Sequence, residues 1–446
     1  MFAVALILSM AVLCFFLNRL VFWHDSVTAG REYRGPLRAG LIVLALIALV
    51  SGCRWCAFLA LAFVARYRQR QRQLPPDSQC PFVSIFVPCF NEGETIEAAI
   101  NSLLELDYPS YEVILVNDGS TDDTLVRAKR FEGRHGPCTV RVHHKSNGGK
   151  WSAHNLAFQR STGELILCID ADSRVHPLAL RKLVARMADP GIAAIAGQMR
   201  VRNRKSLITR LQGLEYLMAN GAVRMGQGLF GTVLIVPGPI GMFRRSVLEE
   251  VWLKYTVGRE NGHSGSVDGP FEGDTFAEDF DLSLAILCLG GRIVYEPEAV
   301  SYTKAPETQF ALLNQRYRWI RGAMQVLRKF HRRAQSNPEV LSSRLLWWIA
   351  STCVLDLAVM PFLYLLGLAL LLLLTVGGGN VPLLAGSFAT FLLVQLSAGA
   401  FFVSIHGDNL RLLKVLPLYG LYNGFLLNSA WAISLLDEGR GKPMRW

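Results

Sequence analysis

The sequence predicts an α/β domain that stands between membrane-spanning α-helices. Two observations predict this fold class. Apolar residues are concentrated in long segments near both ends of the chain, and short apolar runs alternate with helix-like patterns between them. The chain has 446 residues, of which 51% are hydrophobic and 18% are charged, whereas about a quarter of the residues of a typical soluble protein carry charge. This composition argues against an ordinary soluble enzyme and excludes disorder, collagen and a small disulfide scaffold.

Five apolar segments are each long enough to cross the hydrocarbon core of a bilayer, which takes about 20 helical residues. They cover residues 1–22, 39–65, 345–376, 381–405 and 412–436. The first has no basic region ahead of its apolar stretch, so we expect an uncleaved anchor rather than a signal peptide. The last contains Asn423 and Asn428, which leaves open whether two or three segments cross at this end and on which side the C-terminus lies.

Basic residues indicate the orientation and the partners. The sequence RYRQRQRQ at 66–73 follows the second apolar segment, and such clusters stay in the cytosol. We therefore expect a multi-pass protein of the inner membrane with its central domain in the cytosol. The net charge of +11 would also suit nucleic acid, but much of it lies at 66–73 and 328–333, where attraction to anionic lipid headgroups accounts for it. We expect a lipid membrane and no nucleic acid as a partner.

The expected organisation has four parts. These are two N-terminal spans with a basic juxtamembrane segment (1–75), a cytosolic α/β domain (76–308), amphipathic interface helices (309–340) and C-terminal spans (341–446). The nine cysteines show no disulfide framework, as expected of thiols that the cytosol keeps reduced.

Four short apolar runs in the central domain are typical of buried strands. They lie at 83–87, 112–116, 139–143 and 164–169. Helix-like patterns stand after these runs, at 94–105, 121–131, 151–160 and 177–187. This alternation predicts a largely parallel sheet covered by helices on both faces. Ligands bind to such sheets just beyond the carboxyl ends of the strands.

Four polar motifs fall near these strand ends. They are PCFNEGE at 88–94, NDGSTDDT at 117–124, SNGGKWSAHN at 146–155 and DADS at 170–173. Any one of them alone is most often a turn, because glycine and asparagine tolerate a positive φ angle. Four in succession are not expected by chance, so together they predict a ligand site at this edge of the sheet.

The DADS motif suits a divalent cation. Asp170 and Asp172 are one residue apart where the chain leaves a buried strand, and carboxylates so close repel each other unless a cation lies beside them. Such hard oxygen ligands suit Mg²⁺ or Mn²⁺, which often bridge to substrate phosphates. The alternative is that Asp172 caps the next helix. No GxxxxGK[ST] motif occurs, so a P-loop is excluded. A GxGxxG motif that follows a strand and precedes the acid that binds a ribose is also missing, so a nicotinamide cofactor is not supported.

A second acidic group opens the segment AEDFDLSLAIL at 277–287. It contains Glu278, Asp279 and Asp281 ahead of a helical apolar pattern. Capping of the helix accounts for one of these acids, but three exceed what capping needs. We interpret Asp279 as a general base that takes the proton of a nucleophile.

The sequence QRYRWIRG at 315–322 carries a cluster of cations just before an apolar segment. Arg316 and Arg318 are suited to clamp a diphosphate through charge-assisted hydrogen bonds, and Trp319 offers a flat apolar face on which sugar rings stack. The alternative is an amphipathic interfacial helix whose arginines snorkel to water, and the two interpretations are compatible.

This set of motifs resembles the processive, membrane-embedded family 2 glycosyltransferases. The matching residues are Phe90–Glu92, NDGS with Asp118, GGK with Lys150, DAD with Asp170 and Asp172, GPIGMFRR at 238–245, ED with Glu278 and Asp279, and QRYRW. They run in the family's order across residues 83–322. The combination is specific for the family, although no single element is.

The resemblance implies a GT-A fold and a nucleotide-sugar donor, usually UDP-linked. Nucleotide contacts would come from Phe90, Asn91, Glu92, Asp118, Lys150 and Asp170. Asp172 would hold the metal, Mg²⁺ or Mn²⁺. Asp279, with Glu278 beside it, would deprotonate the acceptor hydroxyl, with inversion at the anomeric carbon. The diphosphate and the acceptor would be held by Gln315, Arg316, Arg318, Trp319, Gly238 and Pro239.

The implied activity is the polymerisation of a β-linked polysaccharide, with the growing chain as acceptor, and its movement across the inner membrane. The EDFDLSLAI and QRYRWIRG variants look most like the poly-β-1,6-N-acetylglucosamine synthases, which implies UDP-GlcNAc as donor, a biofilm exopolysaccharide as product and a small membrane partner subunit. The alternatives are a chitin-oligosaccharide, hyaluronan or cellulose-like synthase, or transfer of a single sugar to a lipid. A non-catalytic nucleotide-sugar sensor is disfavoured because Asp172 and Asp279 are both present.

Two features leave alternatives open. The Gly-rich stretch 253–276 is longer than the family pattern has before the ED motif, and it is either a gating or acceptor loop or a flexible insertion. Asp356 lies inside an apolar segment, where a charged group is costly and usually faces a cavity or a partner. We expect Asp356 to line the polymer channel; the alternative is that it lies near the end of a span and reaches the interface.

Overall fold

A computed structural model describes most of the chain. The described residues are 56–68, 73–256, 268–336, 343–363 and 381–442, with isolated positions between these ranges. They form two compact units. The α/β unit consists of Gln69–Thr209 and Gln227–Ile349, and the helical unit consists of Met1–Arg68, Arg210–Gly226 and Ala350–Trp446.

The α/β unit is built on a nine-stranded sheet with the strand order β3-β4-β2-β1-β5-β8-β7-β9-β6. Its first half is parallel apart from the short edge strand β3 (Gly133–His135), which pairs antiparallel with β4. The parallel strands are β1 (Val83–Cys89), β2 (Tyr111–Asp118), β4 (Cys138–Lys145) and β5 (Leu165–Cys168). These are the four strands that the apolar runs predict, and all residues of β2 are buried, as expected of a strand covered on both faces.

The second half of the sheet is mixed, which corrects the expectation of a largely parallel sheet. The strand β8 (Gly241–Arg244) runs antiparallel to β5 on one side and to β7 (Ile192–Val201) on the other. The strand β9 (Arg292–Thr303) is parallel to β7, and β6 (Arg174–Val175) pairs antiparallel with β9. The GPIGMFRR motif thus enters the middle of the sheet as β8.

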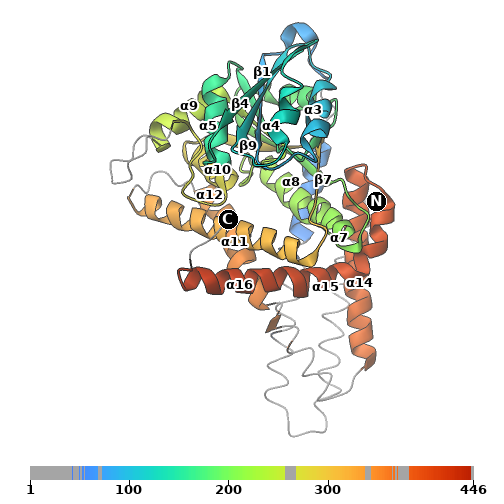
Figure 1. Cartoon of the computed structure of the whole chain (residues 1–446). Helices are drawn as coiled ribbons and strands as arrows, with labels where there is room; N and C mark the ends of the chain where they lie inside the picture. The colour runs from blue at the N-terminus through green and yellow to red at the C-terminus, as the bar shows by residue number, and fades with distance from the viewer. Residues whose placement is uncertain are drawn as a thin grey trace, which may run out of the picture. The chain divides into compact units, whose positions relative to one another are not determined.

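Helices cover the sheet, and Figure 1 shows α3, α4 and α5 alongside its strands. The four predicted helices are present as α3 (Ile96–Leu104), α4 (Thr124–Lys129), α5 (Lys150–Arg160) and α6 (Ala179–Met187). The helix α5 packs on β1 and β2, and α6 packs on β7 and β9. Further along the chain follow α9 (Arg245–Val251), η3 (Trp252–Thr256), α10 (Glu278–Cys288), α11 (Gln309–Ser336) and α12 (Ser343–Trp348).

A buried carboxylate joins the amino ends of the central strands. The side chain of Glu112 is 1% exposed, and its Oε1 atom accepts hydrogen bonds from the Ser84 hydroxyl (2.6 Å) and the Thr162 backbone N–H (2.9 Å). Its Oε2 atom lies 3.0 Å from Arg141 Nη1. This network lies at the edge of the sheet opposite the polar motifs, so it serves the fold.

Replacement of Glu112 by alanine should lower the free energy of unfolding by about 2–4 kcal/mol, because two buried donors lose their acceptor. Thermal unfolding followed by circular dichroism measures this. A matched control is Glu97→Ala, which removes a half-exposed carboxylate paired with Arg127 and Arg130 and should lower the free energy of unfolding by at most about 1 kcal/mol. Equal loss in the two variants would contradict a structural role of Glu112.

The helical unit contains the C-terminal apolar segments. Its helices are η2 (Tyr216–Asn220), η5 (Ile349–Val359), α14 (Val381–Ile405), η6 (Leu410–Leu418), α15 (Tyr419–Leu421), η7 (Tyr422–Leu427) and α16 (Asn428–Gly439); α7 (Leu207–Glu215) and α8 (Gly221–Leu229) belong to it in part. The Tyr422 hydroxyl donates to Glu215 Oε2 at 2.6 Å, which ties η7 to α7.

One helix within the described part of the chain is long and apolar enough to cross a membrane, Leu345–Leu363 with 19 residues. The segment 381–405 is helical as α14, whereas 412–436 is divided among η6, α15, η7 and α16, with Pro417 inside η6. The first predicted span, about half of the second and residues 370–380 lie outside the described residues, and 56–65 of the second span are helical. The prediction of about five spans therefore stays a prediction.

Candidate active site

The polar motifs meet at one edge of the sheet. The motifs PCFNEGE, NDGSTDDT, SNGGKWSAHN and DADS follow or end the strands β1, β2, β4 and β5. Because these four strands are parallel, their carboxyl ends lie side by side. The expected ligand edge is thereby confirmed as a place where residues of all four motifs converge.

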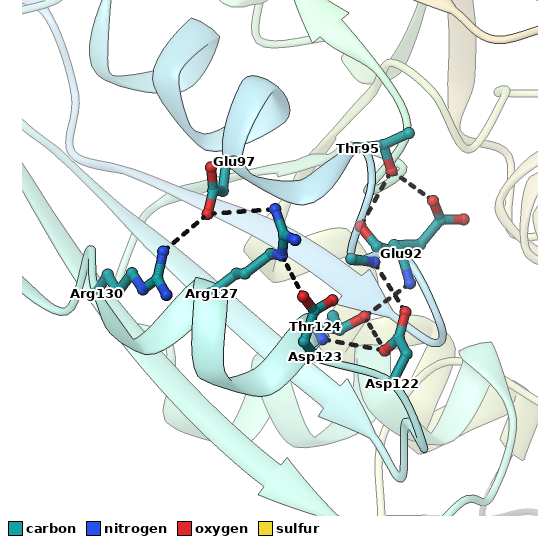
Figure 2. Close-up of polar contacts among 9 residues, drawn as sticks. Glu92, Thr95, Glu97, Asp122, Asp123, Thr124, Arg127 and Arg130 are labelled. Carbon is teal, nitrogen blue, oxygen red and sulfur yellow. Dashed lines mark hydrogen bonds and ion pairs between the residues drawn. The ribbon is translucent and has the colours of Figure 1, made fainter.

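The first two motifs brace each other (Figure 2). The backbone N–H of Glu92 donates to the Thr124 hydroxyl (2.7 Å), and that of Gly93 donates to Asp122 Oδ2 (3.0 Å). A Cβ atom on Gly93 would lie 2.1 Å from Asp123 Oδ1, so a larger residue here would have to displace the Asp123 side chain. The short α4 that begins at Thr124 thus fixes the loop that carries Glu92.

Asn91 shapes the same loop through its backbone. It has a φ angle of 55°, a left-handed conformation that asparagine tolerates better than most residues. Its N–H donates to the Ser120 hydroxyl, and its Oδ1 atom accepts from the Thr121 N–H, both at 2.9 Å. Phe90, just before it, is 47% exposed, which leaves its ring open to a ligand.

Asp118 holds the glycine loop in front of α5. Its Oδ1 atom accepts hydrogen bonds from Lys145 Nζ (2.8 Å) and the Gly148 N–H (3.0 Å), and its Oδ2 atom accepts from the Gly149 N–H (2.8 Å). The side chain is almost fully buried. Both oxygens are therefore engaged within the protein, and the carboxylate sets the position from which Lys150 begins the helix.

Lys150 links the DAD and ED motifs. Its Nζ atom lies 2.6 Å from Asp170 Oδ1 and 3.3 Å from Glu278 Oε1. Burial alone would lower the pKa of Lys150, but the carboxylates of Asp170 and Glu278 outweigh it and raise the pKa well above its ordinary value. Lys150 is thus a fixed cation between two motifs that are more than a hundred residues apart in the sequence.

Gly238 lies against this ion pair. A Cβ atom at this position would be 2.5 Å from Lys150 Nζ and 3.0 Å from Asp170 Oδ1. Pro239 follows in a turn that the Ile240 N–H closes by donating to the Pro237 carbonyl. The GPIG motif therefore places its backbone directly against the Lys150–Asp170 ion pair, and its role toward an acceptor stays a prediction.

Replacement of Gly238 by alanine should lower kcat/KM for the donor by about 10–100-fold, because the added methyl group displaces the Lys150–Asp170 pair. A matched control is Gly424→Ala, where nothing lies within 4 Å of the added atom. Steady-state kinetics of purified variants measures the effect. Full activity of the Gly238 variant would show that this ion pair tolerates displacement and does not position a reactant.

Asp172 is a half-buried carboxylate with few hydrogen-bond donors around it. It accepts from the Ser173 hydroxyl (3.0 Å) and the Thr303 hydroxyl (3.3 Å to Oδ1). Burial, followed by repulsion from Asp170, raises the pKa of Asp172 to about 6. The alternative that it caps a helix is wrong, because β6 follows it and α6 begins only at Ala179.

The two carboxylates of the DAD motif fit a divalent cation. Within the described residues, Asp172 has hydroxyl donors and no ion pair, while the DAD neighbour Asp170 and the loop residue Glu92 add negative charge around it. Carboxylates that repel each other and keep an oxygen open are the donor set that Mg²⁺ or Mn²⁺ takes. Thr303, at the end of β9, is a contact that no sequence motif signals.

Asp279 lies in the first turn of α10, with Glu278 before it. Its Oδ1 atom accepts from the backbone N–H of Phe280 (2.8 Å). Burial, and then the charge of Glu278, raise the pKa of Asp279 to about 6, while Lys150 opposes the shift. The residue at the cap position is Ala277, whose side chain makes no capping bond, so no acid of this group caps the helix, contrary to the expectation for one of them.

The QRYRW sequence lies on α11. The Arg316 guanidinium donates to Gln315 Oε1 (2.7 Å) and stands 4.3 Å from the centre of the Trp319 ring. Arg316 is buried, whereas Arg318 and Trp319 are exposed, because positions two apart on a helix face different sides. The two arginines therefore do not form one paired clamp in this structure, and Trp319 carries the exposed aromatic face.

Comparison with known proteins shows which family model and which relatives this chain is similar to. The sequence model described as "Glycosyl transferase family 2" matches residues 84–252. The poly-beta-1,6-N-acetyl-D-glucosamine synthases of Staphylococcus epidermidis and Staphylococcus aureus (strain COL) are each 30% identical over 246 residues, which is 55% of this chain and 55% of theirs. The chain thus spans about half the length of the curated relatives it matches.

A solved structure confirms the fold. The mannosyltransferase PcManGT from Pyrobaculum calidifontis, solved in complex with GDP-Man and Mn²⁺, is 21% identical and has a TM-score of 0.60, with 90% of this chain and 100% of that chain covered. The likeness supports the predicted GT-A-like α/β fold with its mixed sheet. Within the described residues, one helix is long and apolar enough to cross a membrane.

Proposed function

We propose that the chain is a family 2 glycosyltransferase that polymerises a β-linked polysaccharide, with UDP-GlcNAc as donor and poly-β-1,6-N-acetylglucosamine as product. The match of residues 84–252 to the model of that family supports the proposal. The observation that carries the proposal is the convergence of Lys150, Asp170 and Glu278 at the carboxyl edge of the sheet. Through Lys150, the DAD motif, whose acids are suited to a metal and a diphosphate, lies next to the first turn of α10, which carries Asp279. The names of the curated relatives support the choice of sugar.

In the proposed reaction the acceptor oxygen attacks the anomeric carbon of the donor as the bond to the diphosphate breaks. Asp279 takes the proton of the acceptor hydroxyl, and the configuration at carbon inverts. A carboxylate with a pKa of about 6 is a stronger base than an ordinary aspartate and is still ionised at neutral pH. The burial that raises its pKa also keeps water from competing for the sugar.

Negative charge builds up on the departing diphosphate and needs neutralisation. Asp172, with Asp170 beside it, would hold Mg²⁺ or Mn²⁺, which supplies a Lewis acid for the phosphate oxygens. Lys150 balances Asp170 and Glu278, so it keeps the acidic site from repelling an anionic donor. Exposed Arg318 and Trp319 on α11 are suited to contact the phosphate and a sugar ring.

The membrane part of the proposal rests on composition. The helix Leu345–Leu363 passes the length and composition test for a span. It would belong to a multi-pass unit in the inner membrane through which the polymer leaves. The backbone of η5 includes Asp356, but its side chain lies outside the described residues, so its place in a polymer channel stays a prediction, as does the small partner subunit.

The pH dependence of transfer should follow the carboxyl group of Asp279. A general base acts only when it is deprotonated, so the rate at saturating donor and metal should fall about tenfold per pH unit below about 6 and level off above it. The expected midpoint matches the pKa of Asp279, about 6. A profile that stays flat down to pH of about 5 would mean that another group takes the proton.

A donor panel tests the proposed function. Membranes that contain the protein are incubated with UDP-GlcNAc, UDP-Glc, UDP-GlcA or GDP-mannose, each with Mg²⁺, Mn²⁺ or a chelator, and the product is identified with linkage-specific glycosidases. We expect metal-dependent UDP release with UDP-GlcNAc and a product cut by a β-1,6-N-acetylglucosaminidase. A different polymer, or a single sugar on a lipid, would overturn the sugar or the polymerisation, and no release from any donor would overturn the activity.

A further inference from the structure

A single lysine stands at the centre of three carboxylates beside the ED helix. Lys329 Nζ on α11 lies 2.5 Å from Glu272 Oε2 and 2.8 Å from Asp274 Oδ1, and it also contacts Asp281 on α10. The side chains of Glu272 and Asp281 are 4% exposed and that of Lys329 is 10% exposed. We call this group the Lys329 cluster.

The three acids lie close enough together to resemble a metal site, since their ligand atoms fall within 4.8 Å of one another. Lys329, however, already occupies the centre, and its three N–H donors match three acceptors. The ammonium group stands where a metal ion would have to lie, and Arg333 Nη2 lies 3.4 Å from Glu272 Oε1 as a second cation. The cluster is therefore an ionic joint between parts of the chain.

The joint lies in a tightly packed contact between α11 and the residues that lead into α10. Gly322, Gln325 and Lys329 are three and four residues apart, so they share one face of α11. A Cβ atom on Gly322 would be 2.9 Å from the Ala277 Cβ atom, and Gln325 Oε1 accepts from the Phe276 N–H (3.2 Å). The helix α11, which carries QRYRW, thus packs against Ala277, the residue just before Glu278 and Asp279.

The same lead-in segment is held from its other side by α5. The amide of Asn155 makes two hydrogen bonds with the backbone of Phe271, at 2.9 Å and 3.0 Å. Gln159 donates to the Asp268 carbonyl (2.7 Å), and the His154 ring stacks on Phe271. Residues 268–277 are therefore fixed between the helix that begins with Lys150 and the helix that carries QRYRW. Of the stretch 253–276, residues 268–276 make these contacts, and the role of the stretch as a whole stays a prediction.

We propose that Lys329 is a positioning residue that joins residues 272–281 to α11 and thereby sets the place of Asp279 relative to the acceptor. The proposal rests on the proposed function, in which Asp279 is the base. The donor groups Asp118 and Asp172 make no contact with the cluster among the interactions of the described residues. Loss of the joint should therefore slow transfer and leave donor affinity nearly unchanged.

Three variants of the full chain separate positioning from stability. Lys329→Met keeps the length of the side chain and removes its charge. The triple variant K329M/E272Q/D281N also removes the charges of the two buried carboxylates that Lys329→Met leaves without their lysine, and keeps only that of the exposed Asp274. It should therefore recover most of the lost thermal stability. Gly322→Ala moves α11 away from Ala277 without altering any charge. A matched control is Arg181→Met, which breaks a cation joint to Asp77 and Asp107 at the opposite edge of the sheet.

All three variants should lower kcat by about 10–100-fold, the effect of a displacement of about 1 Å at a reacting group, with the donor KM within about threefold of the wild type. Arg181→Met should lower stability alone. Wild-type kcat in the triple variant would overturn the proposal, because the cluster would then serve stability only.

Hydrogen exchange provides a readout that does not depend on activity. Lys329→Met and the triple variant should both speed amide exchange in residues 278–281 relative to the wild type, while Arg181→Met should not. Unchanged exchange in these residues would overturn the positioning role even if no donor supports activity. If exchange changes as expected but the wild type releases no UDP, the proposed function fails and the joint stands.

Discussion

Replacement of Asp279 by asparagine is expected to lower the transfer rate by about 10²–10⁴-fold, the usual contribution of a general base, while the donor still binds. Asparagine keeps the size of the side chain and can still accept the hydrogen bond from the Phe280 N–H. It cannot take a proton. Steady-state kinetics gives the rate, and calorimetric titration with the donor nucleotide-sugar gives the affinity.

The pH profile sharpens this test. Asp172 also has a pKa of about 6, so the profile is recorded at saturating metal, which keeps Asp172 ionised. Under that condition the remaining rate of the Asp279 variant should lose its inflection at about 6. Glu278→Gln is the neighbouring comparison, since it should lower the pKa of Asp279 by removing a repelling charge and shift the inflection to lower pH. If Asp279→Asn transfers sugar at the normal rate, Asp279 is not the general base.

Replacement of Asp172 by asparagine is expected to reduce metal-dependent transfer by about 10²–10³-fold, the effect of losing one strong stabiliser of transition-state charge. It is also expected to weaken Mn²⁺ binding, because one negative ligand is lost. Electron paramagnetic resonance of free Mn²⁺ measures binding without any turnover. In the wild type the Thr303 hydroxyl donates to the Asp172 carboxylate. In the Asp172→Asn variant the partner of this hydroxyl is an amide group.

A remote acid provides the control for this result. Asp189 pairs with Arg292 and accepts from the Gly191 N–H at the amino end of β7, away from the motifs. Asp189→Asn should leave both Mn²⁺ binding and transfer unchanged. If Asp172→Asn binds Mn²⁺ as the wild type does, the metal is held elsewhere and the role of the DAD motif must be reassigned.

The edge of the sheet that carries the site could be predicted because its determinants are local. Apolar runs define β1, β2, β4 and β5, and each polar motif begins where a run ends. Parallel pairing then brings the motifs together without any knowledge of distant contacts. The pairs Asp170 with Asp172 and Glu278 with Asp279 follow from adjacency in the sequence.

The remaining features depend on contacts between distant residues, which sequence patterns do not encode. The antiparallel strand β8 contains four residues, too few for a periodic signal. Thr303 reaches Asp172 across 131 residues, and Lys329 reaches Glu272 across 57 residues. Arg316 and Arg318 were expected to act as a pair from their spacing, but a helix turns them to different sides.

The apolar segments illustrate a different limit. Composition marks stretches that can lie in a bilayer, but it does not say how the backbone runs through them. Residues 412–436 pass the length criterion, and yet η6 with Pro417 is followed by α15, η7 and α16. Proline lacks the N–H group that a continuous α-helix needs, so the 3-10 turn of η6 has a local cause that average hydropathy does not reflect.

The most direct test of the central claim is the size of the product made from UDP-GlcNAc. The purified full chain, in lipid nanodiscs with Mg²⁺ or Mn²⁺ and radiolabelled UDP-GlcNAc, is stopped while most donor remains, and the product is separated by size. The account predicts label in long chains at low conversion, degraded by a β-1,6-N-acetylglucosaminidase and absent with Asp279→Asn. Label confined to a single sugar on lipid, or no label in any product, would contradict it.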